Sequence, residues 1–128
     1  MPESGLGVWL NSLRERSKLS LRDLAQRSGV DHAYIHRLET GAKEAPSDEV
    51  VNKLSAALSP TKRDAEVLRF LASDPNIDVN ILNFVRENAN VTFEEFHMLT
   101  TVVNRGSRPD YATSLARIRR ILQEDADG

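Results

Sequence analysis

The segment that most constrains the fold runs from Ser20 to Gly41, where two short helical patterns meet at a single glycine. The apolar residues that recur at helical spacing are Leu21, Leu24 and Ala25 before it, then Tyr34, Ile35 and Leu38 after it. Ser20 and Asp23 form a variant of the capping box. Gly29 can take the left-handed conformation that ends a helix, and Asp31 can cap the next one. The sequence therefore predicts two short helices with a very short connection.

Three further helices are predicted in the N-terminal part of the chain. The first, which should end near Lys18, follows from three leucines at helical spacing, Leu6, Leu10 and Leu13. Ser47 is a candidate N-cap for a fourth helix, whose inward-facing residues are Val50, Val51, Leu54 and Leu58. Ser59 and Pro60 predict the start of a fifth, because proline lacks the N–H that the first helical position leaves unbonded. The sequence DPN at 74–76 should break that helix.

The last fifty residues carry three more helical patterns. We expect them at about 78–88, 92–104 and 109–123. A capping box from Thr92 to Glu95 marks the start of the middle one, and the tail EDADG is expected to fray. Since no period-2 alternation is long enough for a strand, we predict an all-α chain, with a five-helix domain at 1–72 and a helical region at 73–128.

Composition excludes several classes of protein. The chain has 128 residues, of which 40% are hydrophobic and 28% charged, as in a soluble globular protein. The absence of cysteine removes disulfides and thiolate metal sites and fits a reducing compartment. No run of roughly 18 apolar residues is present to span a bilayer. We therefore expect a soluble, cytoplasmic protein without a membrane partner.

Enzymatic and metal chemistry find little support. No phosphate-binding glycine loop and no nucleophile with a matching base can be recognised, so we expect neither an enzyme nor a cofactor. His32 and His36 lie four residues apart but lack the further ligands of a zinc site, so no metal is expected. The formal charge of −2 offers no basic footprint for nucleic acid. Any DNA binding must therefore arise from local arrangement.

The arrangement around Gly29 is that of a helix-turn-helix, in which the second helix enters the major groove of DNA. Over a longer stretch that includes these two helices, residues Leu6 to Leu58 resemble the Cro/C1-type family of phage repressors, bacterial regulators and antitoxins, also called the XRE family. The resemblance is carried by LNSLR in the first helix, LSLRDLA, SGV, IHRLETG and Pro46-Ser47. It implies a lambda repressor-like, five-helix domain that binds double-stranded DNA.

The resemblance also implies residue roles. The base-reading positions fall on Asp31, His32, Ala33 and Arg37. Arg37 is the strongest candidate, because its guanidinium fork matches guanine O6 and N7. Contacts to the DNA backbone are expected from Ser20, Arg22, Tyr34, His36 and Lys43. A structural ion pair between the first and third helices is expected from Arg14 and Glu39.

We expect a sequence-specific transcriptional regulator, a repressor that binds an inverted-repeat operator as a homodimer. The candidate dimer or partner contacts are Trp9, Leu115, Ile118 and Leu122. Trp9 can equally pack on the chain's own C-terminal helices. The alternative function is that of an antitoxin or another protein-interaction module, whose C-terminal helices bind a toxin or a regulator.

Overall fold

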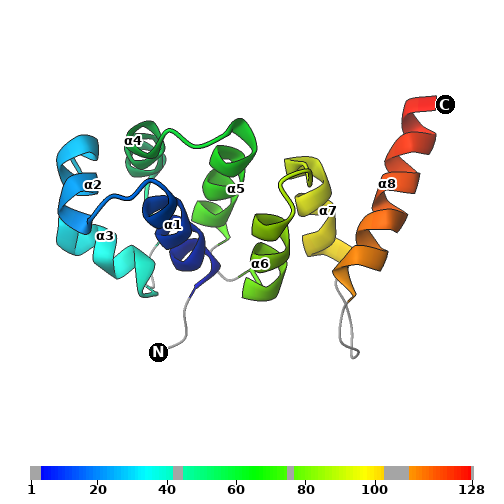
Figure 1. The fold of residues 1–128 in the computed structure, drawn as a ribbon, viewed down its shortest axis with the longest axis horizontal. Coiled ribbons are helices and arrows are strands. Elements are labelled where there is room, and N and C mark those ends of the chain that lie inside the picture. The colour runs from blue at the N-terminus through cyan, green and yellow to red at the C-terminus, as the bar shows by residue number, and fades with distance from the viewer. Residues whose placement is uncertain (1–3, 42–44, 75–76, 103–109, 128) are drawn as a thin grey trace. The chain divides into compact units, whose positions relative to one another are not determined.

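The computed structural model describes residues 4–41, 45–74, 77–102 and 110–127. Within these ranges the chain forms eight α-helices and no strand, which confirms the predicted all-α fold (Figure 1). The helices are α1 Gly5–Arg16, α2 Leu21–Ser28, α3 His32–Glu39, α4 Asp48–Leu58, α5 Lys62–Ser73, α6 Val79–Glu87, α7 Phe93–Val102 and α8 Tyr111–Asp127. None of these described helices is long and apolar enough to cross a membrane.

The chain divides into two compact units, Met1–Val79 and Asn80–Gly128. The first unit holds α1 to α5, and the second holds almost all of α6 together with α7 and α8. The position between residues 72 and 73, which the sequence suggests as a domain boundary, lies inside the first unit. Each unit has its own hydrophobic interior and is described separately below.

The predicted helix caps around Gly29 are present. The Ser20 hydroxyl accepts a hydrogen bond from the Asp23 backbone N–H at 3.0 Å, and the Asp23 carboxylate accepts from the Ser20 N–H at 3.1 Å. The hydrogen bond from the Ser20 backbone N–H, and a second one from the Ser20 side chain, lower the pKa of Asp23. Gly29 ends α2 with φ 76°, a left-handed conformation that glycine adopts without a Cβ penalty. The turn between α2 and α3 is therefore set by residues within it.

The start of α5 differs from the prediction. Ser59 does not cap α5 but ends α4, with φ 48° and its N–H donating to Ser55 O at 3.0 Å. Thr61 caps α5 instead, its hydroxyl accepting from the Asp64 N–H at 3.2 Å. The reason is that Leu58 is buried, so α4 must continue to it and Ser59 is used in closing that helix.

The interior of the first unit is built around α1. This helix contacts α3 on one side and α5 on another, while α2 contacts α3 and α4, and α4 contacts α5. The large side chains that are almost completely buried here are Trp9, Leu10, Leu24, Ile35, Leu38, Leu54, Leu68 and Leu71. Each buried leucine or isoleucine contributes about 1.5–3 kcal/mol of transfer free energy. Their packing holds α3 against α1, and α2 against α3 and α4.

A buried carboxylate joins α1 to α5. Asp64 is only 3% exposed, and its two oxygens accept hydrogen bonds from Arg16 and Arg63, both at 2.8 Å. Its backbone carbonyl accepts from the indole N–H of Trp9 at 3.1 Å. Charged groups this deeply buried need such partners, because desolvation opposes ionisation. Asp64 therefore fixes the side of α1 that faces away from α3.

In the second unit, the capping box at the start of α7 is present as predicted. The Thr92 N–H donates to Glu95 Oε1 at 2.9 Å, and the Thr92 hydroxyl accepts from the Glu95 N–H at 3.1 Å. Arg119 of α8 also binds Glu95, with Nε 2.9 Å from Oε2. Burial opposes the ionisation of Glu95, but the hydrogen bonds from Arg119 and Thr92 outweigh it and lower its pKa. One glutamate thus caps α7 and ties it to α8.

The C-terminal helix is longer than predicted. It continues to Asp127, through most of the tail EDADG that was expected to fray. No glycine or proline precedes Gly128 in this tail to end the helix. The buried hydrophobic residues that the structure describes in the second unit are Ile81, Leu82, Val85, Val91, Phe96, Leu99, Leu115 and Ile118.

Candidate nucleic-acid interface

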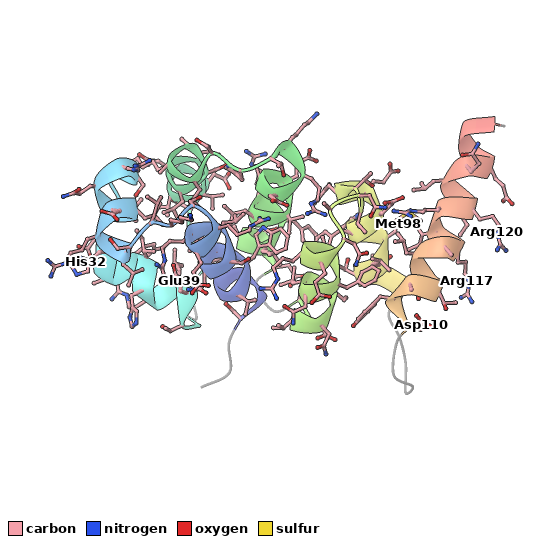
Figure 2. The ribbon with its side chains drawn as sticks, in the orientation of Figure 1. His32, Glu39, Met98, Asp110, Arg117 and Arg120 are labelled. Carbon is pink, nitrogen blue, oxygen red and sulfur yellow. The ribbon has the colours of Figure 1, made fainter. Side chains whose placement is uncertain are left out.

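One face of α3 is exposed, because the residues on its opposite face are buried in the domain. Ile35 and Leu38 are at most 1% exposed, and Val30 in the preceding turn is also buried. Figure 1 shows α2 and α3 together at one edge of the first unit, with α5 beyond α1. In Figure 2 the side chain of His32 points away from the rest of that unit. The outer face of α3 is therefore available to a partner.

The four predicted base-reading residues all lie on this exposed side. Asp31, His32, Ala33 and Arg37 are each classed among the exposed residues of the chain. Asp31 Oδ2 accepts hydrogen bonds from the backbone N–H groups of Ala33 at 3.1 Å and Tyr34 at 3.3 Å. One of its carboxylate oxygens is thus occupied as the N-cap of α3. His32 and Ala33 follow in the first turn, at the end of the helix that docks first into a groove in helix-turn-helix complexes.

Arg37 does not stand alone on that face. Its guanidinium carbon lies 5.6 Å from the centre of the Tyr34 ring, a cation–π contact one turn along α3. Tyr34 itself is half-buried, whereas Arg37 is exposed. The guanidinium therefore lies over the ring of a residue that is less exposed than Arg37.

The residues predicted to contact the DNA backbone differ in their exposure. Ser20, Arg22 and His36 are exposed, and Tyr34 is half-buried. The Ser20 oxygen accepts a hydrogen bond from the Asp23 N–H. Lys43 lies outside the described residues.

The ion pair expected between Arg14 and Glu39 is present and is bidentate. Arg14 Nε lies 2.7 Å from Glu39 Oε2, and Nη2 lies 2.9 Å from Oε1. Asn11 donates to the same carboxylate at 2.9 Å, and Arg14 Nη1 donates to Leu19 O at 2.9 Å. The hydrogen bond with Glu39 raises the pKa of Arg14. Figure 2 places Glu39 at the end of α3 that faces α1. The pair fixes that end of α3.

Sequence reasoning missed Gly7, which sits at the same junction. A Cβ added to Gly7 would lie 2.5 Å from the carbonyl oxygen of Glu39 and 2.8 Å from that of Leu38. Such distances are far below van der Waals contact, and both atoms belong to the backbone. Only glycine therefore allows α1 to approach the end of α3 this closely. The signal available in the sequence was a glycine inside a helical pattern, where it otherwise costs about 1 kcal/mol.

The structure places the four candidate partner contacts mostly in the interior of their own units. Trp9 is 1% exposed, and its indole N–H donates to Asp64 O within the first unit. Leu115 and Ile118 are buried, and Leu122 is half-buried. Ile121, in contrast, is 43% exposed. Among the four predicted contacts, only Leu122 keeps appreciable accessible surface.

The comparison with known families agrees with the helix-turn-helix that the fold shows in the N-terminal part of the chain. The family model described as "Helix-turn-helix domain" matches residues 6–67. The match supports the predicted XRE-like helix-turn-helix in the N-terminal part of the chain.

Individual relatives carry matching names. An uncharacterised HTH-type transcriptional regulator of Mycobacterium tuberculosis (strain CDC 1551 / Oshkosh) is 39% identical over 62 residues, which cover 48% of this chain and 41% of that protein. The HTH-type transcriptional repressor RghR of Bacillus subtilis (strain 168) is 42% identical over 52 residues, covering 41% of this chain and 38% of RghR. The matched region thus spans about two fifths of the length of these relatives. No solved structure matches the chain significantly.

Proposed function

We propose that this protein is a sequence-specific DNA-binding transcriptional regulator acting in the cytoplasm. The observation that carries the proposal is the exposed face of α3, with His32, Ala33 and Arg37 open to a partner on a helix-turn-helix domain. The N-terminal end of that helix enters the major groove, and Arg37 one to two turns later reads a guanine through its two N–H donors. Asp31 serves mainly as the cap that orients the helix.

The proposed regulator is a repressor that binds an inverted repeat as a homodimer. The printed name of RghR supports the choice of a repressor. A dimer is favoured because the formal charge of −2 leaves a single domain with little electrostatic attraction for DNA. Two recognition helices related by a two-fold axis bind half-sites about 34 Å apart. Phosphate contacts from Ser20, Arg22, His36 and Lys43 position each domain without adding sequence information.

Arg37→Ala tests direct readout. A randomised-site selection with the whole chain first defines the preferred site, and mobility shifts then measure affinity for that site and for single-base variants. We expect Arg37→Ala to lose about 1–3 kcal/mol of discrimination at one base pair in each half-site and to keep the preference elsewhere.

Arg69→Ala is the matched control. Arg69 is exposed on α5, so the change removes one positive charge away from α2 and α3. It should weaken binding slightly and equally for all sequences. If the unaltered chain selects no sequence at low salt, or if both arginine variants change discrimination alike, the proposed readout is wrong.

Removing the second unit tests the proposed role of the C-terminal helices. We expect the whole chain to sediment as a dimer and a chain ending at Val79 to sediment as a monomer. The cut follows Val79 because α5 belongs to the first unit, where Asp64 binds Arg16 and Trp9 of α1. Circular dichroism and the fluorescence of the buried Trp9 check that the shortened chain is folded. A folded dimer of the shortened chain would place the interface in the first unit.

A further inference from the structure

We propose that Tyr34 is a specificity-determining residue that acts by positioning the guanidinium of Arg37, and not through its hydroxyl group. The inference deepens the proposed function and rests on it, because it concerns how α3 discriminates between bases. It assigns to the Tyr34 ring a role different from the backbone contact expected from sequence.

The geometry of the pair suits such a role. The guanidinium carbon of Arg37 lies 5.6 Å from the centre of the Tyr34 ring. A guanidinium that lies over a ring can keep its N–H edges free, and these edges form the two hydrogen bonds to guanine O6 and N7. An arginine can therefore keep its contact with the ring while it reads a base.

The surroundings leave this contact as the restraint on Arg37. In the parts of the chain that the structure describes, no ion pair involves Arg37. Arg37 is exposed, whereas Tyr34 is half-buried. A long, exposed arginine loses rotamer entropy when it binds, and a contact that already restricts it reduces this loss. Tyr34 thus restricts the side chain of Arg37 in the free protein, before DNA binds.

The expected effect is measurable as a ratio of affinities. At the base pair assigned to Arg37, we compare the dissociation constant for the wrong base with that for the right one. An exposed cation–π contact corresponds to about a two- to fivefold change in such a ratio. Tyr34→Leu should lower the ratio by this factor, and Tyr34→Phe should retain it, because the ring remains. Loss of a phosphate contact from the hydroxyl would instead lower the affinity for all sequences equally.

A double-mutant cycle shows whether Tyr34 acts through Arg37. In the background of Arg37→Ala, Tyr34→Leu should leave the ratio unchanged, since the positioned group is gone. In the free protein, the ring-current shift of the Arg37 side-chain protons should persist in Tyr34→Phe and vanish in Tyr34→Leu. Thermal unfolding of both Tyr34 variants checks that the domain remains folded.

The outcomes separate this proposal from the proposed function. If the chain selects a sequence and Arg37→Ala reduces the ratio, but a folded Tyr34→Leu variant keeps it, positioning by Tyr34 is overturned while the DNA-binding function stands. An equal loss of ratio in Tyr34→Phe and Tyr34→Leu also overturns it, because the hydroxyl would then be responsible. If the chain selects no sequence at all, both proposals fail together.

Discussion

Replacing Glu39 with alanine is expected to lower the free energy of unfolding of the N-terminal unit by about 3–5 kcal/mol. The Glu39 side chain is only 6% exposed and accepts three hydrogen bonds, two from Arg14 and one from Asn11. Alanine would leave the guanidinium without its carboxylate where water has little access, since the Arg14 side chain is 15% exposed. The unpaired charge then destabilises the folded state.

Urea unfolding followed by the fluorescence of Trp9 measures this effect, because Trp9 is the single tryptophan and lies in the first unit. Glu49→Ala is the matched control. Glu49 pairs with Lys53 at 3.3 Å on the surface of α4, with 78% of its side chain exposed, so its loss should cost less than about 1 kcal/mol. A loss below about 1 kcal/mol for Glu39→Ala would contradict the expectation.

The double substitution Arg14→Met with Glu39→Leu should recover much of the lost stability. Well-packed apolar residues of similar volume often replace a buried ion pair without net loss, because no desolvated charge remains. If the ion pair also orients α3, this stable variant should still bind DNA less selectively. The comparison separates the contribution of Glu39 to stability from its contribution to the position of the recognition helix.

Gly7→Ala is expected to destabilise the same unit by roughly 1–3 kcal/mol. Helix propensity alone predicts the opposite sign, since alanine is about 1 kcal/mol better than glycine inside a helix. The new methyl group, however, would meet the carbonyl oxygens of Leu38 and Glu39 at 2.8 and 2.5 Å. Those atoms belong to the backbone at the end of α3, so relief requires α1 and α3 to move apart.

The sign of the change in the free energy of unfolding for Gly7→Ala distinguishes the effect of helix propensity from that of the close approach. Ala56→Gly on the exposed face of α4 calibrates the propensity scale and should cost about 1 kcal/mol. Under the close-approach explanation Gly7→Ala loses stability and also weakens selective DNA binding, because α3 shifts. If Gly7→Ala is more stable than the unaltered chain, the approach of α1 to α3 is looser than the structure gives.

Local features of the chain could be read from sequence because the groups involved lie within about four residues of one another. The capping boxes at Ser20 and Thr92, the left-handed Gly29 and the cap at Asp31 all occur where the sequence predicts them. The start of α5 shows the limit of such reasoning. Ser59 could begin one helix or end another, and the burial of Leu58 determined which.

The candidate interface likewise has features that the sequence predicts and features that it does not. The exposure of the predicted base-reading positions follows from the register of α3, because burying Ile35 and Leu38 leaves the opposite side exposed. The contact between Tyr34 and Arg37 spans one helical turn and was within reach of sequence, but helical spacing alone does not distinguish it from two independent side chains.

From the amino-acid sequence alone one obtains the all-α class, most helix ends, the helix-turn-helix and the exposed face of its second helix. Only the tertiary structure shows why position 7 requires glycine, that Trp9 is buried, and which roles Asp64 and Arg119 have. The physical reason is distance along the chain. Caps and helical faces depend on neighbours within one turn, whereas these contacts join residues between 24 and 55 positions apart, which come together only when the helices pack.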